Sequence, residues 1–399
     1  MVSEKVFRLA GWHQYWKKGT RMRSETTVGK KVRHAASVAP MRLGFWVPVY
    51  GNWIVSKHPE TQHASFDYSR KLTLLAEEIG FATVLLAEHT FNPFDATADQ
   101  LDAWTVAAGL ATITKHIELM PAVRAAFKHP VIVAKMAGSI DEMSGGRAAL
   151  NLVSGWWQRE SDAMGLPTLP HNERYLRSEE FLTVLKGVWT QQHFSFSGRF
   201  YQITDVTLAP APVSQPHPTI YLGGESDEAQ RLAAKFADVY LINGRPVAET
   251  KTLVDRVRAL AAAEGRDLQF GISAFVIGRE TREAAHAEHE RLYALRHEEA
   301  IPGVDPKVVM IRTYAYARGY VGSNGGTAAG LVGTPQDIAE RFQEFLDIGV
   351  TTFLLQFHPM LEEMARFGEQ VVPLLAKAGV WVHPTRNSYQ QNNGKRSIA

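Results

Sequence analysis

The stretch Asn151-Leu152-Val153-Ser154-Gly155-Trp156 joins an apolar run to a polar loop, and His171-Asn172-Glu173-Arg174-Tyr175 follows shortly after it. The apolar residues 148–153 predict a buried strand, Gly155 predicts a tight turn, and the second cluster predicts the start of a helix. In a β/α barrel the C-terminal ends of the strands carry the chemistry. Hydrogen-bonding groups and indole rings would meet at one such end. The stretch therefore indicates a socket for a flat, anionic and partly apolar ligand.

Strand-like runs alternate with helical patterns over most of the chain. We expect eight strands, at Leu43–Val49, Thr83–Ala87, Ile117–Val123, Ala148–Val153, Thr219–Leu222, Val239–Ile242, Phe270–Ile277 and Val350–Phe357. Eight strands that are mostly followed by helices predict an α/β fold, a (β/α)₈ TIM barrel with insertions. A doubly wound sheet is the alternative, but no glycine fingerprint of a switch point follows the first strand.

Glycine and proline mark the ends of several expected helices. Gly80 should end the first helix, which is expected to bury Tyr68, Leu72, Leu75 and Ile79. Pro130 suits the first turn of a later helix, and Gly145-Gly146 should end it. The buried stripe of that later helix is predicted to be Ile132, Met136, Ile140 and Met143. A last helix at about 361–375 closes the expected ring.

Two segments interrupt the alternation. Residues 194–212 alternate aromatic and polar side chains around Gly198 and predict an inserted hairpin. A longer insertion separates strands seven and eight; its residues 280–300 predict a helix, and residues 318–330, rich in glycine, are a candidate lid. Closure would bring a cation over the pocket, so Arg312 and Arg318 are candidate catalytic residues. Their alternative role is that of plain surface residues.

Charge is unevenly placed along the chain. Residues 1–40 hold nine Lys or Arg and two Asp or Glu, whereas the remaining 359 residues hold 34 basic and 39 acidic ones. The basic residues are scattered and no nucleic-acid-binding module accompanies them, which favours a disordered extension over a targeting or binding arm. Residues 381–399 are polar and predict a frayed tail. The barrel domain is therefore expected at residues 41–380.

Composition excludes several classes of function. The absence of cysteine excludes disulfides, thiolate zinc sites and a cysteine nucleophile. No P-loop, zinc spacing or nucleophile elbow occurs, and Glu88 has no carboxylate partner at the expected strand ends for glycoside hydrolysis. No apolar run reaches the roughly 18 residues of a membrane span, and the N-terminus lacks a secretory core. We expect a cytoplasmic protein that binds no metal, membrane or nucleic acid.

One glycine-rich turn is a candidate phosphate site. Gly223-Gly224-Glu225-Ser226-Asp227 lies between an expected strand and an expected helix. The glycines let the backbone approach a ligand, Ser226 can cap the helix, and the free amides at the helix start attract phosphate. The same pattern also occurs as an ordinary connection. Glu225 counts against phosphate, because a carboxylate repels an anion unless it points away.

Further candidates lie near the same end of the barrel. His171 and Tyr175 are four residues apart and share a helix face, although spacing alone favours structural roles for them. Glu88-His89 ends strand two, where a barrel places catalytic groups, and the alternative is that both line a wall. Arg174 either holds phosphate or pairs with an acid. An apolar pocket is favoured by the aromatic group Trp46, Tyr50, Trp53, Trp156 and Trp157.

Several short motifs follow one another along residues 41–376: Phe45-Trp46-Val47-Pro48, Asp67-Tyr68-Ser69-Arg70-Lys71-Leu72, Leu75-Ala76-Glu77-Glu78, Gly145-Gly146-Arg147, the two opening clusters, Tyr221-Leu222-Gly223-Gly224, and Gly326-Thr327-Ala328 with Leu331-Val332-Gly333-Thr334-Pro335. In this order they resemble the bacterial luciferase-like, flavin-dependent monooxygenases. Within that family the chain looks like the two-component group that acts on alkanesulfonates and dimethyl sulfone.

The resemblance implies a barrel that takes reduced FMN from a separate NAD(P)H-dependent flavin reductase and uses O₂ to oxidise a small substrate. A homo-oligomer is also expected. The resemblance implies that His171 and Tyr175 contact FMN, that Ser226 binds its phosphate, and that His89 lies near its reactive edge. The further cofactor-binding residues expected are Glu88, Asn151 and Glu225, the last at a position where relatives often have a second serine.

Two departures bear on the substrate. Alkanesulfonate enzymes carry an arginine and a histidine where this chain has Ser273 and Phe275, and they usually have a cysteine after strand two. Losing charge-assisted contacts worth roughly 1.5–3 kcal/mol each disfavours a sulfonate and favours a neutral sulfone. Glu88-His89 is unexpected in the sulfone branch, so another small neutral substrate stays open. A non-catalytic flavin-binding barrel and a deazaflavin-dependent dehydrogenase are the remaining alternatives.

Overall fold

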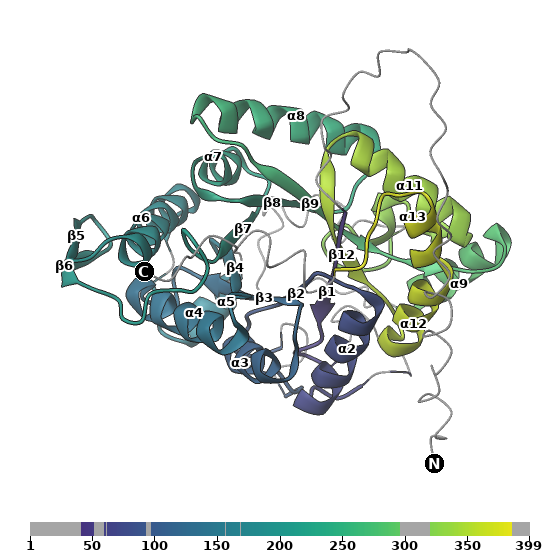
Figure 1. The fold of residues 1–399 in the computed structure, drawn as a ribbon, viewed down its shortest axis with the longest axis horizontal. Coiled ribbons are helices and arrows are strands. Elements are labelled where there is room, and N and C mark those ends of the chain that lie inside the picture. Colours follow the sequence, from purple (N-terminus) through teal and green to yellow (C-terminus); the bar gives the residue numbers. More distant parts are fainter. Residues whose placement is uncertain are drawn as a thin grey trace, which may run out of the picture. The chain divides into compact units, whose positions relative to one another are not determined.

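Eight parallel strands close into a barrel (Figure 1). The computed structural model describes residues 41–51, 60, 62–92, 97–155, 157–167, 169–295 and 320–384. The strands are β1 (Arg42–Val47), β2 (Thr83–Leu86), β3 (Glu118–Arg124), β4 (Ala149–Val153), β7 (Thr219–Gly223), β8 (Val239–Ile242), β9 (Gln269–Phe275) and β12 (Val350–Gln356). Around the ring their order is β1-β12-β9-β8-β7-β4-β3-β2, and each neighbouring pair is parallel. The predicted (β/α)₈ barrel is confirmed.

Helices lie outside the ring of strands and connect one strand to the next (Figure 1). They are α2 (Phe66–Ile79), α3 (Ala103–Ile113), α4 (Pro130–Ser144), α5 (Gln158–Ala163), α6 (His171–Thr190), α7 (Asp227–Phe236), α8 (Val247–Ala263), α9 (Arg282–Ala294), α11 (Pro335–Asp347), α12 (Met360–Gln370) and α13 (Val372–Lys377). None of these described helices is long and apolar enough to cross a bilayer. The predicted extension and tail lie largely outside the described residues, and their boundaries stay predictions.

The barrel interior is a packed core. One cluster of buried side chains comes from six strands: Leu85, Met120, Ala149, Tyr221, Val239 and Leu354. Below it, Arg42 Nη1 donates to the Tyr221 hydroxyl at 2.9 Å, and that hydroxyl donates to Glu118 Oε1 at 2.6 Å. Arg42 and Glu118 are the first residues of β1 and β3, so this network lies at the N-terminal end of the barrel. A structural hydrogen-bond network thus fills the N-terminal end of the barrel, and the C-terminal end is where a ligand is expected.

Two of the sequence motifs hold connections in place. Glu77 Oε1 accepts the backbone N–H groups of Lys115, His116 and Ile117 at 2.8, 2.6 and 3.0 Å. Arg147 fastens the same connection, because its guanidinium donates to carbonyl oxygens of Ala111, Thr114 and Ile117. The turn between α3 and β3 thus has its otherwise unpaired backbone groups satisfied.

Helix α2 ends where the sequence predicted. Gly80 adopts φ 99°, and its N–H bonds back to Ala76 and Glu77. A Cβ atom at this position would lie 2.7 Å from the side chains of Trp381 and His383. Both the left-handed backbone and the close approach therefore require glycine.

The predicted stripe of α4 is half right: Ile140 is buried and Met136 packs partly buried against the core, but the other two positions are wrong. Ile132 and Met143 are 56% and 44% exposed, whereas the face toward the core consists mainly of small residues, Val133, Ala134, Ala137, Gly138 and Ile140. The helix is apolar on more than one face, so periodicity alone does not fix which face is buried. Trp189 of α6 decides it, because its indole N–H donates to the Ala134 carbonyl at 3.1 Å, which needs a small side chain there.

The predicted insertions are present in the described part of the chain. The hairpin consists of β5 (Phe194–Ser197) and β6 (Gln202–Val206), which pair antiparallel. Between β9 and β12 lie β10 (Ile277–Gly278), α9, a 3₁₀ turn at Gly326–Ala329, and β11 (Val332–Gly333), which pairs with β10. The last expected helix is in fact two, α12 and α13, because Pro373 cannot donate a helical hydrogen bond.

Candidate active site

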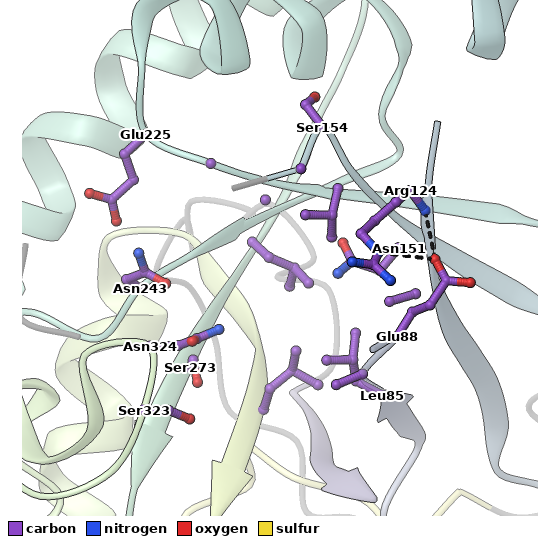
Figure 2. Close-up of a pocket in the computed structure, with 18 of the residues that line it drawn as sticks. Leu85, Glu88, Arg124, Asn151, Ser154, Glu225, Asn243, Ser273, Ser323 and Asn324 are labelled. Carbon is purple, nitrogen blue, oxygen red and sulfur yellow. Dashed lines mark hydrogen bonds and ion pairs between the residues drawn. The ribbon is translucent and has the colours of Figure 1, made fainter. Parts of the chain in front are cut away.

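A cavity of about 550 Å³ lies at the C-terminal ends of the barrel strands (Figure 2). Its apolar wall comes from six strands: Trp46, Leu85, Ala122, Val153, Leu241 and Leu354. The volume is in the range of cofactor and small-ligand sites. Polar side chains surround this wall, so the cavity suits a ligand with a flat apolar body and polar edges.

The structure brings together the described residues that the sequence nominated. The cavity is lined by Glu88, His89, Asn151, His171, Tyr175, Glu225 and Ser226. Arg312 and Arg318 lie outside the described residues, so their catalytic role stays a prediction. Of the aromatic group, Trp46 and Tyr50 line the cavity, Trp53 and Trp156 lie outside the described residues, and Trp157 contacts the His89 ring edge-on at 5.8 Å between ring centroids.

One end of the cavity has the geometry of an anion cradle. Ser226 is the N-cap of α7, and its Oγ accepts the Ala229 N–H at 3.2 Å. Gly224 adopts φ 122°, and a Cβ there would lie 2.9 Å from the Ala229 side chain. Burial raises the pKa of Tyr175, and hydrogen bonding with Ser226 opposes the rise. The tyrosine hydroxyl, the serine hydroxyl and the helix N-terminus therefore converge, as phosphate binding requires.

His171 lies at the rim of this cradle. Its ring is tilted against Tyr175 with centroids 5.0 Å apart, and its Nδ1 lies 3.8 Å from Glu228 Oε2. The side chain is about half exposed. His171 and Tyr175 thus share a face, as their spacing predicted, but only the tyrosine reaches deep into the site.

Glu225 does not leave an unpaired negative charge beside the cradle. Arg245 Nη2 donates to Glu225 Oε1, and the two side chains are only 11% and 7% exposed. Figure 2 shows Glu225 on the opposite side of the pocket from Glu88 and Arg124. The objection that a carboxylate would repel phosphate is therefore removed by a neutral ion pair.

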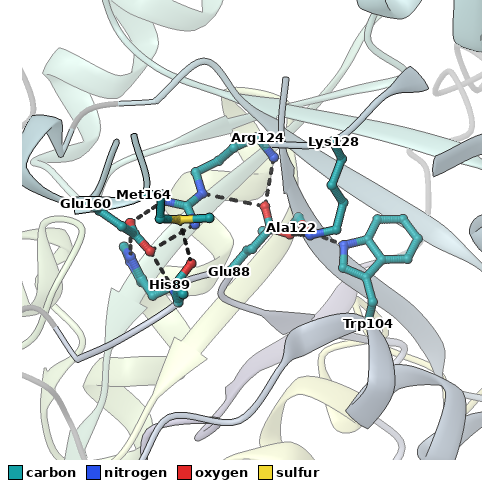
Figure 3. A network of polar contacts seen from close by, with 9 residues as sticks. Glu88, His89, Trp104, Ala122, Arg124, Lys128, Glu160 and Met164 are labelled. Atoms are coloured by element: carbon teal, nitrogen blue, oxygen red, sulfur yellow. Dashed lines mark hydrogen bonds and ion pairs between the residues drawn. The ribbon is translucent and has the colours of Figure 1, made fainter. Parts of the chain in front are cut away.

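A charged network lies on the other side of the cavity (Figure 3). Glu88 Oε2 accepts the backbone N–H of Arg124 at 2.9 Å, and its Oε1 accepts from Lys128 Nζ. Arg124 ends β3 and stacks its guanidinium over the Phe127 ring at 3.8 Å. Both carboxylate oxygens of Glu88 are therefore held by basic residues, Oε2 by Arg124 and Oε1 by Lys128.

Glu160, from α5, joins this network to His89. Arg124 Nη1 and Nη2 donate to its two carboxylate oxygens, and the Thr90 N–H donates to Oε1 at 2.5 Å. His89 Nδ1 lies 3.3 Å from Oε2. Burial by itself would raise the pKa of Glu160, but hydrogen bonds from His89 and Arg124 outweigh it and hold the pKa at about 2. The carboxylate is therefore ionised at neutral pH.

Some buried polar atoms at the cavity have no partner among the described residues. They are Trp46 Nε1, Asn151 Oδ1 and Arg174 Nε. Buried polar groups in proteins are nearly always hydrogen-bonded, so unpaired ones in a cavity indicate a polar ligand. An amide acceptor and an indole donor match the edge of a heteroaromatic ring.

The wall formed by the ends of β8, β9 and residues 320–330 carries uncharged polar groups: Asn243, Ser273, Ser323 and Asn324. Gln356, the last residue of β12, organises it. Gln356 Oε1 accepts the Ser323 N–H at 3.0 Å, and its Nε2 donates to Ser273 Oγ at 3.1 Å. This wall presents donors and acceptors to a ligand without a formal charge.

Residues 320–330, all but the first two residues of the candidate lid, are hydrogen-bonded to the barrel. The Gly244 N–H donates to the Asn324 carbonyl at 2.8 Å. Gly325 has φ 91°, and a Cβ there would lie 2.1 Å from the Gly244 carbonyl oxygen. These residues form a wall of the cavity in the structure, and a closing motion of the lid stays a prediction.

Among the residues of the site that sequence reasoning missed are Arg124, Glu160, Asn243 and Gln356. Arg124 and Asn243 directly follow expected strands, and Gln356 is the penultimate residue of another, so their position at strand ends was a usable signal. Glu160 gave no such signal. It lies in a short helix after β4, and only the folded chain places it against His89.

Comparison with known proteins agrees with this geometry. The luciferase-like monooxygenase family model matches residues 41–352. An "FMNH(2)-dependent dimethylsulfone monooxygenase" of Pseudomonas putida is 38% identical over 347 residues, which cover 84% of this chain and 95% of the relative. A protein of the same name from Pseudomonas fluorescens (strain Pf0-1) is 35% identical, covering 84% and 94%.

Solved structures of the same fold include long-chain alkane monooxygenase LadA, with a TM-score of 0.75 at 20% identity, covering 90% of this chain and 96% of that one. DmoA from Hyphomicrobium sulfonivorans has a TM-score of 0.72 at 18% identity, covering 86% and 90%. At these identities the likeness shows the fold alone. The family match over most of the barrel, with the two curated relatives, shows that this chain belongs to the luciferase-like monooxygenase family.

Proposed function

We propose that this protein is a two-component monooxygenase that uses reduced FMN and O₂ to oxidise a small, neutral organosulfur compound of the dimethyl sulfone type. The substrate class is inferred from the uncharged wall of the cavity, which consists of Asn243, Ser273, Ser323 and Asn324. A sulfone offers two oxygen acceptors and no charge, which amide and hydroxyl donors satisfy. A sulfonate would lose its solvation at this wall without gaining a cation there.

The residues present fit FMN. The Gly224 turn, Ser226 and Tyr175 would hold the phosphate, and the volume of about 550 Å³ accommodates the ring system. Asn151 Oδ1 and Trp46 Nε1, both without partners among the described residues, would bond to the polar edge of the ring. The relatives' name supports the reduced cofactor, since both are described as FMNH(2)-dependent.

When bound, reduced FMN supplies the two electrons with which O₂ delivers one oxygen atom to the substrate and one to water. The protein's own residues bind, orient and exclude water. The apolar wall around Leu85, Leu241 and Leu354 keeps the cavity dry, and His89 lines it with a ring nitrogen that can hold or move a proton.

A reactant that arrives already reduced has to come from another protein. We therefore propose an NAD(P)H-dependent flavin reductase as partner, together with a cytoplasmic location and a homo-oligomeric state. These finer assignments rest on the family membership and on the name of the relatives.

The test is turnover with a purified flavin reductase, NADH and FMN. We expect dimethyl sulfone to be consumed only with O₂, with ¹⁸O from ¹⁸O₂ in the product, and methanesulfonate to be consumed at least about tenfold more slowly. Equal consumption of the two would contradict the neutral-substrate assignment. Tight binding of reduced FMN with no turnover of sulfones, sulfonates or other small neutral compounds would favour the non-catalytic barrel. Activity only with reduced deazaflavin would favour a dehydrogenase.

A further inference from the structure

Glu160 is a buried carboxylate whose contacts converge on one catalytic candidate. Its side chain has no solvent exposure, and it lies in α5 rather than at a strand end. Arg124 holds both of its oxygens, and the Thr90 N–H fixes Oε1. Oε2 is the atom that faces His89 Nδ1 at 3.3 Å. The carboxylate is thus held from two sides in a position that addresses one particular ring nitrogen.

An ionised carboxylate can only accept a hydrogen bond. With its pKa held at about 2, Glu160 keeps its charge at neutral pH, so the ring nitrogen beside it has to carry the proton. In a neutral imidazole the other nitrogen then holds the lone pair. His89 also packs against Trp157, with ring planes 74° apart, and it lines the cavity. Packing and charge therefore both restrict how the ring is presented.

The charges of the network balance when His89 is neutral. Glu88 and Glu160 supply two negative charges, and Arg124 and Lys128 supply two positive ones. A proton added to His89 would make this cluster net positive next to Glu160, which can stabilise the imidazolium. His89 can therefore take up a proton and release it again while its Nδ1 keeps the contact with Glu160.

We propose that Glu160 is a positioning residue that holds His89 in the tautomer protonated at Nδ1, so that Nε2 is the nitrogen that exchanges a proton with the contents of the cavity. In that step Nε2 takes a proton from a donor in the cavity and forms imidazolium, while the Nδ1 proton stays hydrogen-bonded to Glu160. Returning the Nε2 proton restores the starting state. This proposal rests on the proposed function only in giving His89 a part in turnover.

The tautomer is measured directly, in the ligand-free protein, by ¹⁵N NMR of histidine-labelled chain. The His89 signals are assigned from their loss in His89→Gln. We expect the parent at pH 7–8 to show a protonated Nδ1 and an unprotonated Nε2, and Glu160→Gln to populate the Nε2–H tautomer. A protonated Nε2 in the parent would overturn the proposal, and so would an unchanged spectrum in a folded Glu160→Gln variant.

Glu88→Gln is the matched control for this measurement. It removes the same charge from the same network and also weakens the contacts of Arg124, but the contacts of Glu88 are with Arg124 and Lys128. The His89 tautomer should remain that of the parent. A tautomer change of equal size in both variants would mean that the total charge of the network, and not the contact with Glu160, determines the tautomer of His89. Should Glu160→Gln fail to fold, the parent spectrum decides by itself.

A double-mutant cycle adds a second readout, product formed per reduced FMN oxidised. We expect Glu160→Gln to lose about 10- to 100-fold, as positioning partners of histidines commonly do, and to cause no further loss in a His89→Ala background. Additive losses would overturn the proposal, because Glu160 would then act independently of His89. If His89→Ala alone forms product at the parental rate, the role of His89 in the proposed function fails, while the spectrum still decides the tautomer.

Discussion

Arg245 and Glu225 form a nearly buried ion pair beside the glycine turn that precedes α7. The Glu225 carboxylate thus lies next to the anion cradle, and its charge is neutralised by Arg245, which follows the neighbouring strand β8. A pair of this kind is costly to break, because the remaining charge is left without water or partner.

Arg245→Leu should therefore weaken FMN binding and destabilise the fold by about 3–5 kcal/mol, because the Glu225 carboxylate would remain unpaired beside the phosphate. The double variant Glu225→Gln/Arg245→Leu should recover most of both losses. Flavin titration and urea unfolding measure them. A double variant no better than Arg245→Leu would show that the arginine itself, rather than neutralisation of Glu225, is needed.

Ser226→Ala and Tyr175→Phe should each weaken binding of reduced FMN, measured anaerobically, because each removes a hydroxyl from the cradle. Ser226→Ala should also cost about 0.5–2 kcal/mol of stability through the lost helix cap. Thr281→Ala is the matched control. The Thr281 hydroxyl caps α9 by accepting the Ala284 N–H, so the variant removes a helix cap but should leave flavin affinity unchanged. If both site variants bind like the parent, the phosphate lies elsewhere.

His89→Ala should bind FMN within a few fold of the parent but lose about 10²–10⁴-fold in product formation, with H₂O₂ released instead. The role proposed for the ring is proton transfer, whereas the cradle proposed to hold the phosphate is on the far side of the cavity. Peroxide and product are quantified per flavin oxidised. A parental product yield without extra peroxide would mean that His89 lines the pocket and takes no part in the chemistry.

Asn243→Arg should shift the preference from dimethyl sulfone toward methanesulfonate by about tenfold or more, because a charge-assisted contact is worth roughly 1.5–3 kcal/mol. Asn243→Met is the control of similar length without charge, and it should not favour the sulfonate. The ratio of kcat/KM values for the two substrates is the measurement. An unchanged ratio would place the substrate away from this wall.

Glu160 should make stability depend on pH in the acid range. Its folded pKa of about 2 lies below the ordinary value of 4.5, so its contribution is fully present above about pH 4.5 and is lost as pH falls toward 2. The difference is on the order of 3 kcal/mol. In urea unfolding, the gap between parent and Glu160→Gln should be largest at pH 6–7 and shrink by pH 3. If this difference in unfolding free energy does not change with pH, the contacts of Glu160 do not lower its pKa.

The sequence predicted those parts of the fold that depend on local patterns. The bounds of β8 match the prediction, and Gly80 ends α2 as expected, because short apolar runs and a required left-handed residue are visible in one dimension. The face of α4 was not predictable, since that helix is apolar on several sides and a tryptophan three elements away in sequence selects the buried one.

The site divides in the same way. Ser226 and Gly224 were found because a cap and a glycine turn are adjacent in sequence. Arg245 neutralising Glu225, and Glu160 bound to His89, join residues 20 and 71 positions apart. Such pairs depend on which strand ends meet in the closed barrel, and no local pattern encodes them.

Gln356 links the side chain at position 273 to the glycine-rich insertion. Its amide bonds to Ser273 on the uncharged wall of the cavity and to Ser323 in the glycine-rich insertion. A side chain without a hydroxyl at position 273 would remove one of the hydrogen bonds that orient this amide, while its three hydrogen bonds to Ser323 would remain. The cavity lining at position 273 and the placement of residues 320–330 are therefore coupled through one amide, so a substitution at position 273 should also affect how firmly the insertion is held.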